Sequence, residues 1–197
     1  MFLPGIMNQE NINLLPCDGE LRYYRGFEES DLFEILRSSI NWRQDSITVY
    51  GKTHPQPRLT CWFGDRAYSY SGITMHPDPW NPHLLKLKKK IEATTGHKFN
   101  SLLVNFYRDG SDHVSWHADD ERELGPNPAI ASLSFGETRR FQLRHRFKKD
   151  LETITLDLET GSLLLMSGSI QRHWVHRIAK TAKPLGGRIN LTFREII

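Results

Sequence analysis

The second half of the chain consists of short apolar or alternating segments separated by turn residues, and this pattern constrains the fold most strongly. Seven such segments occur, at residues 99–107, 129–135, 139–147, 153–158, 162–167, 173–178 and 188–194. Turn signals such as Asp109-Gly110 and Thr160-Gly161 lie between them. Short strands repeated at this spacing predict a β-sandwich, jelly roll or barrel.

Two helices are expected before these strands. We place the first at about residues 31–40, with Ser30 as its N-cap. The second begins at Asn81-Pro82, because proline is favoured in the first helical turn, and it ends before Gly96. Helices followed by strands indicate the α+β class. We therefore predict a double-stranded β-helix (jelly roll) core with two helices braced on one sheet.

Length and composition indicate one globular domain. The chain has 197 residues, of which 38% are hydrophobic and 25% are charged, and these values exclude disordered, collagen-like and coiled-coil proteins. We assign residues 1–25 to an N-terminal arm and residues 26–197 to a single domain. No apolar run approaches the ~20 residues of a membrane span. The N-terminus also lacks the features of a secretory signal.

The cysteines and the charge bear on location and partners. Cys17 and Cys61 match no metal-binding or redox spacing. Reduced thiols without an export signal predict an intracellular protein, located in the cytoplasm of a bacterium or in the nucleus of a eukaryote. Cys61 lies beside Trp62 and Phe63 and is predicted to pack in the core. A net charge of +3 permits a polyanionic partner without requiring one.

The last predicted strand, residues 188–194, has one apolar and one polar face, because side chains alternate along a strand. The polar face carries Arg188, Asn190, Thr192 and Arg194. This pattern leaves two interpretations open. Either the polar face is solvated, or it lines the interior, where buried arginines need an anionic partner such as a dicarboxylate.

A candidate metal site begins with His117 and Asp119, which point to the same side of an extended segment. Two histidines and one carboxylate form the ligand set of many non-haem iron sites, so a second histidine is required. His145 lies among arginines and lysines, which disfavour a nearby dication. His173 and His176 are three residues apart, so only one of them faces the metal, and spacing does not decide which.

The order of these features is more informative than each feature alone. An H-x-D pair, a later histidine and an arginine-bearing strand occur in the order that a 2-oxoglutarate dioxygenase requires. In such an enzyme the iron has three protein ligands and is chelated by the 2-oxo acid. A distal arginine binds the remaining carboxylate through two hydrogen bonds, for which a guanidinium is well suited.

Several segments resemble the AlkB family of nucleic-acid oxidative demethylases, and most closely the animal-type AlkB homologue 2 and 3 group. They are residues 105–110 (NFYRDG), 117–124 (HADDEREL), 130–136 (IASLSFG), 161–166 (GSLLLM), 173–176 (HWVH) and 188–194 (RINLTFR). The likeness covers about residues 45–195 in unbroken order.

The resemblance implies roles for individual residues of the centre. The implied iron ligands are His117, Asp119 and His176, because the family places its second histidine in a W-x-H element. For 2-oxoglutarate, it implies Asn105 and Tyr107 as an N-x-Y pair, Arg188 on the distal carboxylate, Arg194 on the carboxylate nearer iron, and Asn190 and Thr192 lining the same pocket.

The resemblance also implies a surface for the damaged base. Asp120 and Glu121 follow the iron carboxylate, where acidic groups suit a base made cationic by methylation. Tyr68 and Tyr70 correspond to the family's aromatic base-recognition segment, with Tyr70 stacking on the flipped base. Tyr50 lies where the family inserts a side chain into the base stack.

A run of cations is predicted to form a basic hairpin. It comprises Arg139, Arg140, Arg144, Arg146, Lys148 and Lys149. We interpret it as a phosphate-binding element in which Arg144 contacts substrate. The alternative is an edge strand that carries charge to prevent aggregation.

The predicted function is oxidative demethylation of DNA, directly reversing N-alkyl damage such as 1-methyladenine and 3-methylcytosine. The enzyme would use Fe(II), O2 and 2-oxoglutarate and release formaldehyde, succinate and CO2. Partners would be nucleic acid, with DNA favoured over RNA, and no membrane, and we expect a monomer. The alternatives are the same chemistry on RNA or a protein side chain, or a catalytically silent nucleic-acid binder. The intact H-x-D…H set argues against silence, and the acidic pair Asp120-Glu121 favours a base as substrate.

Overall fold

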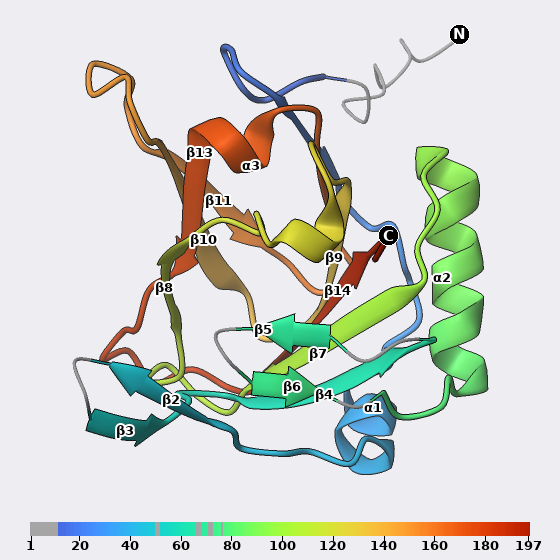
Figure 1. Ribbon diagram of the computed structural model, residues 1–197. Coiled ribbons are helices and arrows are strands. Elements are labelled where there is room, and N and C mark those ends of the chain that lie inside the picture. Colours follow the sequence, from blue (N-terminus) through green and yellow to red (C-terminus); the bar gives the residue numbers. More distant parts are fainter. Residues whose placement is uncertain (1–11, 50–51, 66–67, 71–72, 76) are drawn as a thin grey trace, which may run out of the picture.

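The fold is a pair of facing antiparallel sheets with the two longer helices on one outer side (Figure 1). The computed structural model describes residues 12–49, 52–65, 68–70, 73–75 and 77–197, and for residues 47–49, 52, 68–70 and 73–75 it describes the main chain. Within these ranges, no helix is long and apolar enough to cross a membrane.

The larger sheet supplies most of the pocket wall described below. It has six strands in the order β1 (Glu20–Tyr24), β12 (Leu163–Ser167), β9 (Ile130–Gly136), β14 (Arg188–Arg194), β7 (Ser101–Tyr107) and β4 (Leu59–Gly64). All neighbouring strands are antiparallel. β14 therefore lies inside the sheet, paired on both sides.

The smaller sheet has four strands, in the order β11 (Ile154–Leu158), β10 (Arg139–His145), β13 (Trp174–Ile178) and β8 (Val114–His117). Two separate hairpins are formed by β2 (Ser46–Val49) with β3 (Lys52–Pro55), and by β5 (Tyr68–Tyr70) with β6 (Ile73–Met75). Each of the seven predicted segments corresponds to a strand whose ends agree with it to within two residues, whereas β8 was not among the predicted segments.

A hydrophobic core lies between the two sheets. Buried residues from both sheets contribute to it, including Leu103 and Leu164 from the larger sheet and Phe141, Leu143 and Ile178 from the smaller one. The consecutive strands β7, β8, β9 and β10 alternate between the two sheets, as do β12, β13 and β14. The predicted α+β class and double-stranded β-helix core are therefore confirmed.

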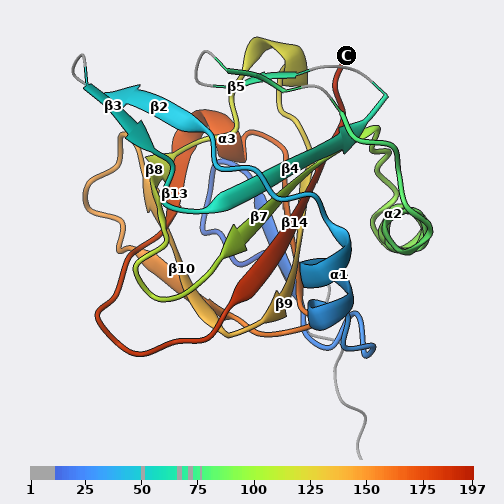
Figure 2. The same cartoon turned by 90° about the horizontal axis from the view of Figure 1, so that it is seen from below.

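Both predicted helices cover the outer face of the larger sheet (Figure 2). In α2 (Pro82–Thr95), the Asn81 side chain accepts a hydrogen bond from the Leu84 amide, and Gly96 ends the helix with a φ of 75°. Buried side chains of α2 share one cluster with apolar residues of β14. Two helices braced on one sheet are thus confirmed.

The start of the first helix differs from the prediction. The helix α1 spans Phe33–Ser39, and its N-cap is Leu32, which makes no side-chain capping bond. Asp31 instead accepts a hydrogen bond from the Phe33 amide, at 3.1 Å. The prediction of Ser30 as N-cap is therefore wrong, because the Asp31 carboxylate accepts the hydrogen bond from the Phe33 amide at the start of the helix.

The N-terminal segment takes part in the fold as far as it is described. We assigned residues 1–25 to an arm, yet residues 20–24 form β1, which pairs along its whole length with β12. Asp18 reaches the turn after β10, where its carboxylate accepts hydrogen bonds from Lys148 and His145 at 2.6 and 3.1 Å. Cys61 is fully buried, as predicted.

Candidate active site

The polar face of β14 points between the sheets and is not solvated. Arg188, Asn190, Thr192 and Arg194 are all at most 7% exposed. The register of β14 with β7 pairs Asn190 with Asn105 and places Arg188 opposite Tyr107. Because directly opposite residues share one face of a sheet, these six side chains form a single polar wall.

The H-x-D pair lies across from this wall, on the smaller sheet. His117 ends β8 and is paired with His176 of β13, so the two rings are 4.3 Å apart between centroids. The ligand atoms of His117, Asp119 and His176 all lie within 4.8 Å of one another. The structure thus brings His176 next to His117 and Asp119, although His176 follows them by 59 and 57 residues in the sequence.

A register irregularity in β8 contributes to this arrangement. The pairing changes between His176, opposite His117, and Ile178, opposite Val114, so β8 has one more residue than β13 over this stretch. An extra residue of this kind changes which side chains face inward. Both His117 and Val114 accordingly line the same pocket.

The orientation of His117 suits metal binding. Its Nδ1 lies 2.8 Å from the main-chain oxygen of Ser115, and a carbonyl can only accept, so Nδ1 carries the proton. The lone pair is then on Nε2. His176 also directs Nε2 toward Asp119, at 3.8 Å from Oδ2. Two neutral imidazoles and one carboxylate are a donor set that fits Fe(II).

The other downstream histidines lie elsewhere. His173 ends the short helix α3 (Ile170–His173), which the sequence pattern did not predict, and its Nδ1 contacts the main-chain oxygen of Ser169 at 3.0 Å. His145 accepts hydrogen bonds at Nδ1 from two main-chain amides, which leaves its Nε2 proton directed at Asp18. Of the three candidates, His176 alone adjoins the H-x-D pair.

Strong electrostatic coupling holds the carboxylate in its ionised form. Arg194 donates a hydrogen bond to Asp119 at 2.6 Å, and both side chains are buried. Burial alone would raise the pKa of Asp119, but Arg194 and the two histidines favour the charged form and lower the pKa to about 2. Burial, with a contribution from His117, lowers the pKa of His176 to about 3. At neutral pH Asp119 is therefore ionised and His176 is neutral, as metal ligands must be.

At the other end of the pocket, Arg188 offers a site for an anion. Its Nη2 donates to Ser134 at 2.9 Å, whereas Nε and Nη1 have no hydrogen-bond partner among the described residues. A buried guanidinium left with free donors is costly without a ligand. Burial lowers its pKa, but only to about 10, so it is charged at neutral pH. The pocket that joins Arg188 to the H-x-D pair thus fits a dicarboxylate such as 2-oxoglutarate.

One charged residue among those that line the pocket was not predicted from the sequence. Arg58 precedes β4, is 7% exposed and donates from Nε to the Asn105 side chain at 2.8 Å. It lines the same pocket as Arg188 and Arg194. No periodicity or motif around residue 58 indicated this position, because it depends on the long-range pairing of β4 with β7.

The structure gives less support to the predicted substrate-binding residues than to the predicted metal and 2-oxoglutarate residues. Asp120 is exposed and pairs with Arg146 at 3.1 Å, and neither it nor Glu121 is among the residues that line the pocket. The side chains of Tyr50, Tyr68 and Tyr70 lie outside the described part of the chain. Their roles stay predictions.

The basic hairpin is only partly as predicted. Arg139 is 2% exposed and donates to three main-chain carbonyls, so its assignment to a phosphate-binding surface is wrong. Ion pairs engage Arg140 with Asp157, Arg146 with Asp120, and Lys148 with Asp18. Arg144 is exposed, and its guanidinium lies 4.4 Å from the centre of the Trp116 ring.

The jelly-roll core, the two-histidine-one-carboxylate cluster and the arginine at the far end of the pocket define the class of Fe(II)- and 2-oxoglutarate-dependent oxygenases. The pattern of the 2OG-Fe(II) oxygenase superfamily matches residues 23–194, and the chain belongs to this family. It is accordingly a dioxygenase that uses Fe(II), 2-oxoglutarate and O2.

Named relatives refine this assignment. Alpha-ketoglutarate-dependent dioxygenase alkB homolog 3 is 45% identical in Rattus norvegicus, over 98% of this chain and 71% of the relative. The Homo sapiens protein of that name is 44% identical, with coverage of 98% and 73%. DNA oxidative demethylase ALKBH2 of Bos taurus is 36% identical, with coverage of 98% and 72%. A solved structure, "The structure of OsALKBH1", is 20% identical with a TM-score of 0.62, covering 89% of this chain and 97% of that one, and it shows the same fold.

Proposed function

We propose that this protein is a DNA oxidative demethylase that directly reverses N-alkyl damage such as 1-methyladenine and 3-methylcytosine. The observation that carries the proposal is the pocket that has the H-x-D pair at one end and Arg188 at the other. Relatives whose name states DNA oxidative demethylation are 36–39% identical over most of this chain.

In this proposal His117, Asp119 and His176 hold Fe(II). Bound there, the metal with O2 and 2-oxoglutarate supplies the oxidising chemistry that converts an N-methyl group to formaldehyde while the co-substrate becomes succinate and CO2. The protein itself fixes the positions of the metal ligands. The Ser115 carbonyl orients the His117 ring, and the opposite strand pairing holds His176 beside it.

The polar wall of β7 and β14 binds 2-oxoglutarate in this proposal. Arg188 takes the distal carboxylate through its free Nε and Nη1 donors, which are buried and therefore not screened by water. Arg194, next to Asp119, takes the carboxylate nearer iron. Asn105, Tyr107, Asn190 and Thr192 line the space between them.

The damaged base enters from the mouth of the pocket. We assign Tyr70 and Tyr68 to stacking on the base, Tyr50 to filling the gap that a flipped base leaves in a duplex, and Asp120 and Glu121 to the cationic lesion. Arg144 would contact the phosphate chain. We further propose an intracellular monomer that prefers DNA over RNA.

The test is anaerobic reconstitution with Fe(II), followed by addition of O2 and 2-oxoglutarate with oligonucleotides that carry one lesion. Single-stranded DNA, duplex DNA and RNA with 1-methyladenine or 3-methylcytosine are compared. We expect formaldehyde and succinate in equal amounts with DNA, and loss of both products in Asp119→Asn. Succinate without demethylation of any nucleic acid would favour another substrate, such as a protein side chain. No succinate with any substrate would favour a silent binder.

A further inference from the structure

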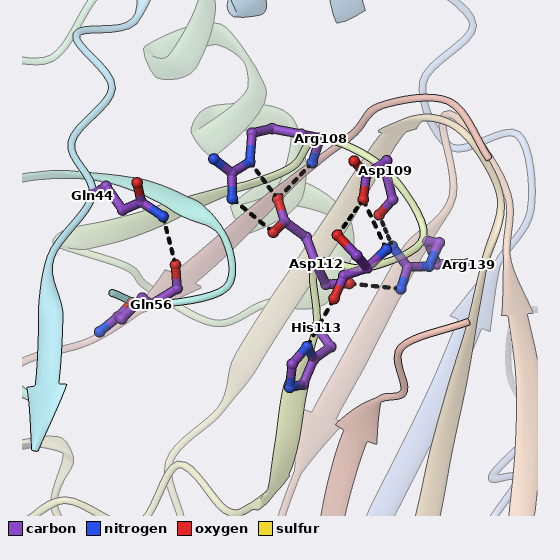
Figure 3. A network of polar contacts seen from close by, with 8 residues as sticks. Gln44, Gln56, Arg108, Asp109, Asp112, His113 and Arg139 are labelled. Atoms are coloured by element: carbon purple, nitrogen blue, oxygen red, sulfur yellow. Dashed lines mark hydrogen bonds and ion pairs between the residues drawn. The ribbon is translucent and has the colours of Figure 1, made fainter. Parts of the chain in front are cut away.

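Arg139 is a buried cation that lies outside the pocket yet contacts its wall. It opens β10 and is 2% exposed. Its Nη1 donates to the main-chain oxygen of Asp109 at 3.0 Å, and its Nη2 donates to that of Asp112 at 2.9 Å (Figure 3). Nη2 also donates to the main-chain oxygen of Ala179, at 3.0 Å. A planar guanidinium is suited to holding several carbonyls at fixed angles.

These three carbonyls belong to two segments that carry site residues. Residues 108–113 join β7, which holds Asn105 and Tyr107, to β8, which ends in His117. Ala179 directly follows β13, the strand of His176. Arg139 therefore links the β7–β8 connection to the end of β13. That connection lies between Tyr107 and the metal ligand His117, and β13 carries the metal ligand His176.

The ring of Tyr107 lies close to two guanidinium groups. The Cζ of Arg139 is 5.6 Å from its centre, and the Cζ of Arg188 is 5.3 Å from the same centre. Both distances are within cation–π range. Tyr107 and Arg188 line the pocket, whereas Arg139 does not. Any effect of Arg139 on a ligand is thus transmitted through these two neighbours.

The hydrogen bonds that the structure records for the Arg139 side chain go to main-chain carbonyls and not to the buried carboxylate of Asp112. Arg108 engages Asp112 through two side-chain hydrogen bonds, at 2.7 and 2.8 Å, and a third from its main-chain amide at 2.9 Å (Figure 3). The contacts of Arg139 to residues 109, 112 and 179 are to neutral carbonyls. Its positive charge adds to that of Arg188 at the distal end of the pocket, and the carboxylates of Asp112, Asp109 and Glu137 offset part of it.

We infer that Arg139 is a positioning residue for 2-oxoglutarate: it holds Tyr107 and Arg188 in the geometry that receives the distal carboxylate. The inference rests on the proposed function, because it assumes that this end of the pocket binds that carboxylate. It adds a residue that touches neither the co-substrate nor the metal but raises the affinity for a dicarboxylate.

The experiment compares Arg139→Lys with a matched control, Arg108→Lys. Lysine keeps the charge but cannot hold three carbonyls and lie flat over a ring. Arg108 lies in the same connecting segment and supports it through Asp112. Its guanidinium is not among those that the structure records over the Tyr107 ring. Affinity for 2-oxoglutarate is measured by anaerobic titration calorimetry with Fe(II), alongside kcat, KM and melting temperature. Oxalate serves as a second probe, since it chelates a metal without reaching Arg188.

We expect Arg139→Lys to weaken 2-oxoglutarate binding and raise its KM by about tenfold, as for one misplaced charge-assisted hydrogen bond. The kcat at saturating 2-oxoglutarate and the affinity for oxalate should stay near wild type. Arg108→Lys should leave the KM within about twofold. Equal losses in both variants, or parallel loss of oxalate affinity, would overturn the inference and leave a purely structural role.

Two further measurements keep the result interpretable. If Arg139→Lys does not fold, Arg139→Gln is used instead, because glutamine retains a planar donor group. We expect the same rise in the KM for 2-oxoglutarate in that variant. Arg188→Ala separates the inference from its premise. Unchanged 2-oxoglutarate affinity in Arg188→Ala would refute the proposed co-substrate site, whereas a large loss there with none in the Arg139 variants would refute only the role of Arg139.

Discussion

The β14 strand carries two arginines, and β10 with its following turn carries six cations, but the fold places the two groups differently. Arg188 and Arg194 are buried in the wall of the pocket. Arg140, Arg146 and Lys148 lie at the surface, each beside a carboxylate. Arg188 thus has buried donors that suit a ligand, whereas these surface cations are already halves of exposed ion pairs.

This comparison teaches that a basic run does not by itself indicate an anion-binding surface. Burial removes water from Arg188, so a ligand carboxylate there is only weakly screened. A surface cation beside a carboxylate is already partly neutralised, and such exposed pairs contribute little to stability. Arg139 is a third case, since it is buried but bound to main-chain carbonyls. The immediate neighbours of each guanidinium therefore decide whether it is available to bind an anionic ligand.

The largest expected effect is at the metal ligands, in the buried region. His176→Ala, His117→Ala or Asp119→Ala should abolish turnover, because each removes one of three protein ligands. His173→Ala is the matched control, since His173 is three residues away and its ring contacts Ser169 instead. Bound iron per chain and succinate formation are the measurements. Iron binding retained in His176→Ala but lost in His173→Ala would reverse the ligand assignment.

The next effect concerns Arg188. Arg188→Ala should raise the KM for 2-oxoglutarate by roughly 10- to 100-fold, because a hydrogen bond to a charged group contributes about 1.5–3 kcal/mol. Arg188→Lys should restore only part of the affinity, since an ammonium cannot bind a carboxylate through a planar fork. Steady-state kinetics with varied 2-oxoglutarate checks this. If the alanine variant has the same KM as wild type, Arg188 does not bind the co-substrate. The difference in use between the arginines of β14 and the cations of β10 would then be refuted.

A smaller effect is expected in the pH dependence of the metal-free protein. The pKa of Asp119 is about 2 in the folded protein, below the ordinary value of 3.8. Its stabilisation is present above that ordinary value and is lost as the pH falls from about 4 to 2, by about 2 kcal/mol in total. Asp119→Asn should flatten this part of the curve of unfolding free energy against pH. The same slope in Asp119→Asn and wild type would contradict the assignment.

The smallest effect distinguishes two exposed cations of the β10 region. Arg144 stacks on Trp116 with no ion pair among the described residues, whereas Lys148 pairs with Asp18 at 2.6 Å. Arg144→Gln should reduce the slope of log K against log salt for DNA binding by roughly one. Lys148→Gln should change it less. If both variants keep the wild-type slope, the cations of β10 and its turn are only a charged edge.

Local patterns in the sequence predicted several elements correctly. Asn81 and Gly96 mark the ends of α2, because capping depends on residues within one turn. The alternation at 188–194 predicted a strand with one polar face, and the structure has that strand. It could not show where the polar face points, since a solvated face and a pocket wall have the same pattern.

Other features required contacts between distant segments. The choice of His176 over His173 depends on the pairing of β13 with β8. The burial of Arg139 depends on carbonyls 27 to 40 residues away in the chain. Arg58 reaches Asn105 because β4 pairs with β7. None of these pairings leaves a local signal.

The sequence by itself determined the periodicity of the strands, the caps of α2 and the residue types of the metal site, because these depend on neighbours along the chain. Only the tertiary structure decided which of the candidate polar groups meet. Each sheet places side chains from non-consecutive strands on one face, and the space between the two sheets excludes water. Burial and partner together decide whether an arginine binds a ligand, a carbonyl or a surface carboxylate.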